Sequence, residues 1–237
     1  MNAKHQNMQS QSALISGLSL LLMAIAAAFS FGYVHSSLIE SGNPMQTFAN
    51  LQASASLFHM GILGWLVIIV ADVLVSWSFY VYLKPIHREY SLLAGFFRLL
   101  YAAVLATAVS HLVIAGKIVQ EDTNLFGESM DEMAAQVMLS ITAFESIWSL
   151  GLILFGVHLM LIGFVALQAK KIPKAISILL VLAGFSYTLI HLMYSFFPQL
   201  DRATALLEAI LSIPMTVAEL GFGIWLVFKG RSGMPPD

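Results

Sequence analysis

Residues 149–192 read SLGLILFGVHLMLIGFVALQAKKIPKAISILLVLAGFSYTLIHL, two long apolar runs joined by a short basic turn. Each run is long enough to cross a bilayer as a helix, which takes about 20 apolar residues at a rise of about 1.5 Å per residue. The turn carries Lys170, Lys171 and Lys174 with no acidic residue between them. Because loops rich in Lys and Arg stay in the cytoplasm, this hairpin predicts two membrane spans joined by a cytoplasmic turn.

The composition of the whole chain indicates the same environment. Of its 237 residues, 59% are hydrophobic and only 10% are charged, whereas a soluble domain has about 25% charged residues. The absence of cysteine from the sequence excludes disulfides, thiolate metal sites and cysteine nucleophiles. No hydrophilic stretch is large enough to fold separately, so a single transmembrane domain over residues 1–237 is predicted.

Apolar runs and turn signals divide the chain into six predicted spans, an all-α polytopic helix bundle. The spans are expected at residues 13–34, 57–83, 92–116, 147–167, 175–197 and 205–228. Residues 35–56, with Gly42-Asn43-Pro44, are predicted to be an external loop, and Asp201 and Arg202 a second, shorter one.

Two further features concern the ends of spans. The third span leads into an acidic loop that holds Glu121, Asp122, Glu128, Asp131 and Glu132, and the fourth helix is expected to begin before its span, near Met133. Residues 4–28 also resemble a secretory signal with a cleavage site, but the apolar run continues past it, which favours an uncleaved first span.

The distribution of Lys and Arg predicts the orientation. Eight of them lie in the segments assigned to the cytoplasm: Lys4, Lys84, Arg88, Lys170, Lys171, Lys174, Lys229 and Arg231. Only Lys117 and Arg202 lie in segments assigned to the outside, and Arg98 lies inside a span. Both termini are therefore predicted to be cytoplasmic.

Several stretches resemble a known family. They are FGVHLMLIGF at 155–164, IPK at 172–174, LAGFSY at 182–187, PMTVAELGFGIWLVFKG at 214–230 and GFFR at 95–98. Together they are similar to domain-of-unknown-function family 4386, a group of small multi-pass bacterial membrane proteins. The resemblance covers nearly the whole chain, although residues 188–191 lack an acidic residue that relatives often carry there. The resemblance implies the fold and a location in the cell membrane, the inner membrane of a bacterium, and it implies no activity.

Ionisable residues inside the spans are the candidate functional groups. A charge at the bilayer centre costs about 2.5–3.5 kcal/mol, so such residues usually face the bundle interior and have partners. Asp72, Arg98, His158 and Glu219 lie in the middle or inner half of their spans. They predict an interior pocket for a small polar ligand, an anion or a proton relay. The alternative is a structural ion pair of Arg98 with Asp72 or Glu219.

A second set of ionisable residues lies towards the external ends of the spans. His59, His111 and His191 come from three spans, with Glu145 on a fourth helix. Three imidazoles and a carboxylate suit zinc or another divalent metal, and two histidines suit a b-type haem. These residues are the basis of an alternative, an intramembrane metal- or haem-binding enzyme. Interfacial histidines bonded to water or lipid headgroups are the simpler interpretation, which we prefer.

The sequence contains no nucleotide-binding, serine-hydrolase or zinc-protease motif. It also lacks the basic, aromatic surface pattern of nucleic-acid-binding proteins. These features favour a non-enzymatic bundle that transports a small molecule or ion or senses a ligand. Its expected partners are the lipid bilayer and a small polar ligand. A structural accessory subunit of a membrane complex is a third hypothesis.

Overall fold

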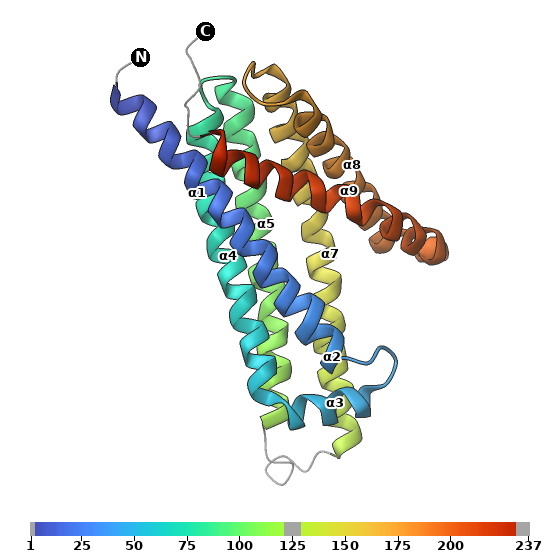
Figure 1. The fold of residues 1–237 in the computed structure, drawn as a ribbon. Coiled ribbons are helices and arrows are strands. Elements are labelled where there is room, and N and C mark those ends of the chain that lie inside the picture. The colour runs from blue at the N-terminus through green and yellow to red at the C-terminus, as the bar shows by residue number, and fades with distance from the viewer. Residues whose placement is uncertain (1–2, 121–128, 231–237) are drawn as a thin grey trace. The chain divides into compact units, whose positions relative to one another are not determined.

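The computed structural model describes residues 3–120 and 129–230, and within these ranges the chain is almost entirely helical and contains no strand. The long helices are α1 (Ala3–Ala27), α4 (Ala55–Leu83), α5 (Arg88–Gln120), α7 (Met130–Gln168), α8 (Lys174–Phe196) and α9 (Asp201–Phe228) (Figure 1). Helix α1 continues through a π-helical stretch, η1 (Ala28–His35), into α2 (Ser36–Leu38).

Six helical segments of the described chain are long and apolar enough to cross a membrane. This finding confirms the predicted all-α bundle with six membrane-spanning helices. Helix α7 is 39 residues long, about 58 Å at 1.5 Å per residue, and so exceeds a bilayer core of about 30 Å. The cytoplasmic position of the termini stays a prediction.

The segment 35–56 was predicted to be a loop, and this prediction is wrong. It contains helix α3 (Pro44–Ala53), whose first turn is capped by the Asn43 side chain accepting a hydrogen bond of 3.1 Å from the backbone N–H of Gln46. Gly42 has φ 79°, in the left-handed region that favours glycine. Asn and Pro signal a turn, but they are also the preferred residues at the N-cap and first position of a helix.

The predicted loop at Asp201 and Arg202 is also corrected, because both residues lie in the first turn of α9. A short 3₁₀ turn, η2 (Pro198–Leu200), makes the connection from α8 instead. Of the predicted acidic loop, residues 121–128 lie outside the described residues. Asp131 and Glu132 belong to the first turn of α7, where Glu132 Oε2 accepts a hydrogen bond of 2.8 Å from the backbone N–H of Ser129.

The chain forms two compact units, and α1, α4, α5 and α7 contribute residues to both. Unit 1 comprises residues 1–22, 70–103 and 149–237, and unit 2 comprises residues 23–69 and 104–148.

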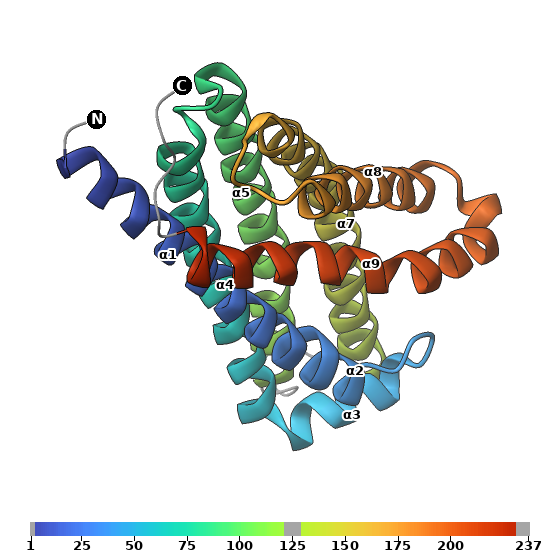
Figure 2. The ribbon, with the colours of Figure 1, turned by 45° about the horizontal axis from the view of Figure 1, so that its top comes forward.

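In unit 1, α8 and α9 lie side by side as an antiparallel hairpin (Figure 2). Helix α8 also packs closely on α7, because a Cβ added at Gly156 would lie 2.5 Å from the carbonyl oxygen of Gly184. A Cβ at Gly163 would lie 2.9 Å from the backbone nitrogen of Val181. The seven-residue spacing of Gly156 and Gly163 thus marks the face on which α8 approaches α7.

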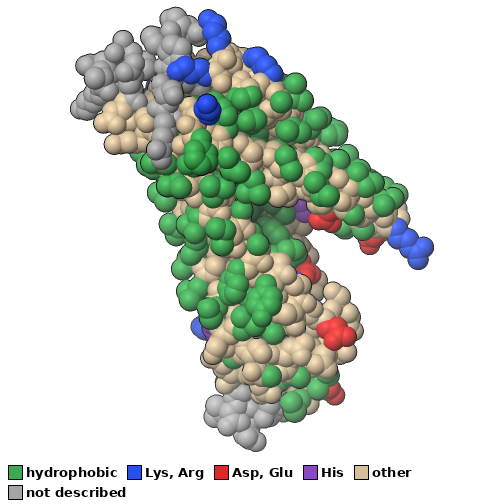
Figure 3. All heavy atoms as spheres, viewed as in Figure 1, with side chains coloured by type: hydrophobic (Ala, Val, Ile, Leu, Met, Phe, Trp, Pro, Cys, Tyr) green, Lys and Arg blue, Asp and Glu red, His purple; other side chains and the backbone are tan. Residues whose placement is uncertain are grey.

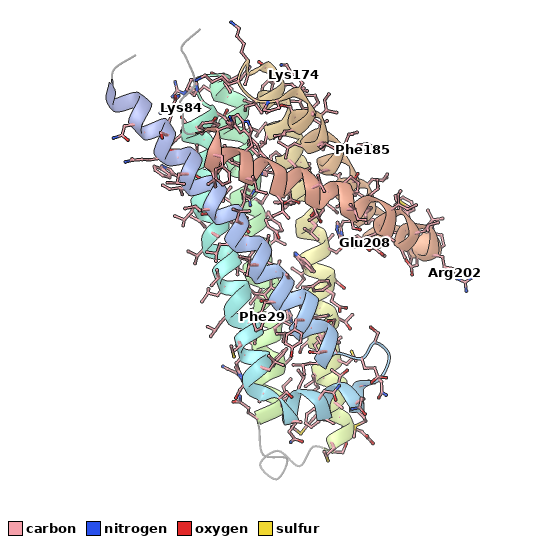
Figure 4. The ribbon with its side chains drawn as sticks, in the orientation of Figure 1. Phe29, Lys84, Lys174, Phe185, Arg202 and Glu208 are labelled. Atoms are coloured by element: carbon pink, nitrogen blue, oxygen red, sulfur yellow. The ribbon has the colours of Figure 1, made fainter. Side chains whose placement is uncertain are left out.

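The outward surface of this hairpin suits a lipid environment. Hydrophobic side chains cover much of the visible face of α9 (Figure 3), and the exposed ones include Leu206, Ile210, Ile213, Val217 and Phe228. Lys84 and Lys174 lie at one end of unit 1, and Arg202 lies at the far end of the α8–α9 hairpin (Figure 4).

The core of unit 2 is aromatic. The ring of Trp65, which is buried, lies 5.0 Å from the Trp148 ring and 5.2 Å from the Phe144 ring, both edge to face. Beside this cluster, His35 Nε2 lies 2.9 Å from Glu145 Oε1. Edge-to-face packing of this kind contributes about 0.5–1.5 kcal/mol per pair beyond area burial.

Candidate functional site

Arg98 is the largest fully buried side chain in the described part of the protein. It lies on α5, and its guanidinium Nη2 is 2.8 Å from Oδ1 of Asp72 on α4. Both side chains are 0% exposed. The short connection from α4 to α5 forms a helical hairpin that places the two residues at matching heights. Taking two charges out of water costs several kcal/mol per ion, so this pair depends on close geometry and further hydrogen bonds.

His158 on α7 supplies one of those hydrogen bonds. Arg98 Nη1 lies 3.0 Å from His158 Nε2, and His158 Nδ1 lies 2.8 Å from the carbonyl oxygen of Ala94. A guanidinium can only donate, so Nε2 must accept, and Nδ1 then carries the proton and donates to Ala94. His158 is therefore a neutral imidazole in this arrangement.

Aromatic rings enclose the guanidinium. Its Cζ atom lies 5.3 Å from the ring centroid of Phe155 and 6.0 Å from that of Phe79. Phe79 also stacks on His158 with an angle of 11° between the ring planes. Cation–π contacts contribute about 2 kcal/mol or more when they are shielded from water, so these rings help to hold Arg98 charged in the interior.

The fourth member of the predicted set, Glu219 on α9, has a different partner. Its Oε1 accepts a hydrogen bond of 2.9 Å from the hydroxyl of Tyr187 on α8. Glu219 also interacts electrostatically with Arg98 and Asp72. We name Asp72, Arg98, His158 and Glu219 the Arg98 centre.

A row of polar groups continues from Glu219 along the facing sides of α8 and α9. Tyr194 donates a hydrogen bond of 2.7 Å to Glu208, and the ring of His191 lies 6.2 Å from the rings of both Tyr187 and Tyr194. His191 Nδ1 is 3.0 Å from Ser149 Oγ on α7. We name Tyr187, His191, Tyr194 and Glu208 the hairpin row.

Neither buried oxygen of Asp72 has a hydrogen bond of good geometry among the described residues, although Oδ1 lies in ion-pair contact with Arg98 Nη2 at 2.8 Å. Its Oδ2 is buried and meets no hydrogen-bond donor among the described residues. Buried polar atoms are hydrogen-bonded in the great majority of cases, and an exception needs an explanation. A purely structural ion pair does not explain this oxygen, which has no ion-pair contact either.

Comparison with known proteins identifies the family. Residues 15–230 match the model described as "Domain of unknown function (DUF4386)". The chain belongs to this family. A relative in Archaeoglobus fulgidus, described as an uncharacterized protein, is 29% identical over 181 residues, which are 72% of this chain and 83% of that protein. No solved structure matches the chain.

The geometry of this DUF4386 protein answers one question that the sequence left open. The partner of Arg98 is Asp72, while Glu219 is bonded to Tyr187. The hydrogen bond of His158 to Arg98, and those of Tyr187 and Tyr194 to the two glutamates of α9, were not predicted from the sequence. A signal was present, because Tyr187, His191 and Tyr194 recur at helical spacing on one face of α8.

The residues of the predicted metal or haem site have other partners. His59 Nδ1 donates a hydrogen bond of 2.7 Å to the carbonyl oxygen of Ala55, Glu145 contacts His35, and His191 contacts Ser149. His111 is half-buried on α5. Within residues 3–120 and 129–230, no three His, Asp or Glu side chains are grouped so that they could hold a metal ion. The metal- or haem-binding enzyme stays a prediction.

Proposed function

We propose that this DUF4386 protein is a multi-pass protein of the cell membrane, with both termini in the cytoplasm, that transports or senses a small polar ligand or ion. The ligand binds at the Arg98 centre. Ionisable groups within membrane spans are expensive, and where they occur they commonly line ion or substrate pathways. The six apolar helices and the contents of the Arg98 centre support this assignment.

The observation that carries the proposal is that Asp72 Oδ2 is buried without a hydrogen-bond donor among the described residues. A carboxylate held only to fix helix packing gains most when both of its oxygens meet donors, because a buried oxygen without one costs about 1–3 kcal/mol. Here Oδ2 is enclosed and has no donor among the described residues, although Arg98 contacts the other oxygen. A polar ligand or ion that reaches Oδ2 would complete the centre.

The charges of the centre support the same conclusion. One guanidinium, in contact with Asp72, lies within electrostatic range of a second carboxyl group, that of Glu219, which forms no salt bridge with it among the described residues. His158 is a neutral acceptor and adds no positive charge. A minimal structural pair needs one acid and one base, so the second acid is available for a function.

A thermal-shift screen of the purified protein in mild detergent tests this proposal. The panel contains inorganic ions and small polar compounds, and a compound that binds at a hundred times its Kd stabilises the folded state by about 2.7 kcal/mol. We expect at least one compound to raise Tm, and Glu219→Gln to abolish that shift. Glu145→Gln is the matched control, because Glu145 is exposed and lies in unit 2.

Two results would count against this function. One is that no compound in the panel raises Tm and that the reconstituted protein moves no ion across a membrane. The other is a shift of equal size in wild type, Glu219→Gln and Asp72→Asn, which would place the bound compound elsewhere on the protein.

A further inference from the structure

We propose that the ion bound at the Arg98 centre is a proton and that the carboxyl group of Glu219 binds it. The hairpin row is the pathway by which the proton reaches Glu219. This inference rests on the proposed function and names its ion. The sequence alone left an anion, a polar substrate and a proton open; the contacts of the centre separate them.

The contacts of Arg98 disfavour an anion as the ligand. The guanidinium of Arg98 is engaged on both Nη atoms, by Asp72 and by His158, and its faces are covered by Phe79 and Phe155. The other Lys and Arg side chains of unit 1, as far as the structure describes them, lie towards helix ends, as Figure 4 shows for Lys84, Lys174 and Arg202. An anion that entered the centre would lie near the carboxylates of Asp72 and Glu219, and no further Lys or Arg side chain would balance its charge.

The carboxyl groups of Glu219 and Glu208 have unused acceptor positions and no cationic partner in the described chain. A carboxylate offers about four lone-pair positions, and Glu219 uses one of them, for the hydroxyl of Tyr187. Glu208 likewise has one hydrogen bond, from Tyr194. In the described chain neither carboxyl is within salt-bridge distance of a Lys, Arg or His side chain. Both glutamates therefore have the capacity to bind a positive charge.

The neighbours of the two glutamates favour a proton over a larger cation as the ligand. The partners of both glutamates are tyrosine hydroxyls, which donate and accept protons, and the ring of His191 lies between the two tyrosines. Rows of carboxyl, hydroxyl and imidazole groups are the form that proton relays take inside membranes. No three-residue metal-holding group occurs in the described chain, and a proton needs no cavity.

The charged and titratable surroundings of Glu219 come from every helix around it. Tyr187 of α8, Arg98 of α5 and Asp72 of α4 interact with Glu219 itself. Tyr101 of α5 and Glu208 of α9 interact with Tyr187, and His158 of α7 contacts Arg98. Residues 7–22 of α1 contain no ionisable side chain. Protonation forms one O–H bond on the Glu219 carboxylate with a proton from water, and release reverses it, so no redox partner is needed.

Proton flux into liposomes tests the inference. The protein is reconstituted with a trapped pH-sensitive dye, and a potassium gradient with valinomycin makes the lumen negative, with and without each compound found in the thermal-shift screen. We expect wild type to acidify the lumen, Glu219→Gln to lose this activity and Glu145→Gln to retain it. Glu219→Asp keeps a carboxyl group and should retain measurable flux, which separates loss of the acid from loss of the fold.

The inference is overturned if wild type acidifies the lumen no faster than protein-free vesicles under every condition, or if Glu219→Gln acidifies it as fast as wild type. An anion that raises Tm through Arg98 without proton movement would remove this inference and leave the proposed function intact. Proton flux that needs Glu219, with no compound recognised in the screen, would support the inference and make the proton itself the ligand.

Discussion

Arg98 Nη1 donates a hydrogen bond to His158 Nε2 across 3.0 Å, so the histidine serves as a neutral acceptor for a buried cation. The bond joins α5 to α7, and the ion pair of Arg98 with Asp72 joins α5 to α4. Three helices of unit 1 are thus held together through one side chain.

We expect Asp72→Leu to destabilise the protein by about 3–5 kcal/mol, because it leaves the charge of Arg98 buried without its acid. Arg98→Leu should cost a similar amount. The double variant should be more stable than either single variant, since an apolar pair leaves no uncompensated charge. Thermal unfolding in detergent measures all three, and a double variant whose loss equals the sum of the two would contradict the pairing.

His158→Phe removes the acceptor for Arg98 and should destabilise the protein by about 1–3 kcal/mol, the cost of an unsatisfied buried donor. His158→Gln retains an acceptor oxygen and should cost less. His87→Phe is the control, because His87 lies at the start of α5 and is partly exposed. Nitrogen NMR of labelled histidine should show His158 as the tautomer protonated on Nδ1; the Nε2-protonated form would rule out the bond to Arg98.

Gly156→Ala should destabilise the contact between α7 and α8. Its new Cβ would lie 2.5 Å from the backbone oxygen of Gly184 and would also clash with Oγ1 of Thr188. Overpacking of this kind typically costs about 1–3 kcal/mol. Gly221→Ala is the matched control on α9, where an added Cβ meets nothing within 4 Å. Equal melting temperatures for the two variants would show that α7 and α8 are not in such close contact.

The orientation can be tested with single cysteines, because the natural sequence has none. Lys171→Cys, in the basic turn, should be protected in intact cells from a thiol reagent that does not cross membranes, and should react once the cells are opened. Arg202→Cys, at the far end of the α8–α9 hairpin, should react in intact cells. The opposite pattern would place the termini outside.

The sequence was sufficient to predict the six long helices, because a bilayer requires long apolar runs that few other environments produce. It was insufficient for α3, where Asn43 and Pro44 suit both a turn and a helix start. The partner of Arg98 also stayed open. Apolar residues surround these helices on every side, so periodicity does not define which face of α4 or α9 points inwards.

The polar contacts of the α8–α9 hairpin show a similar limit. The sequence placed Glu208 and Glu219 on one face of α9, and Tyr187 and Tyr194 on one face of α8. The pairing of Tyr187 with Glu219 and of Tyr194 with Glu208 depends on the antiparallel register of the hairpin, and on Pro214, which lies within α9 between the two glutamates. Register is a property of the packed helices, which residue spacing alone does not give.

The most direct test of the central claim is an experimental structure of the protein in a lipid nanodisc, at a resolution that shows ordered solvent and ions. Because a bound proton itself gives no density, the Arg98 centre as a binding site predicts an ordered water molecule or polar ligand within hydrogen-bond distance of Asp72 Oδ2 and close to Glu219. A structure in which a protein donor already satisfies Oδ2, with Glu219 turned away from Arg98, would contradict it and leave a structural ion pair.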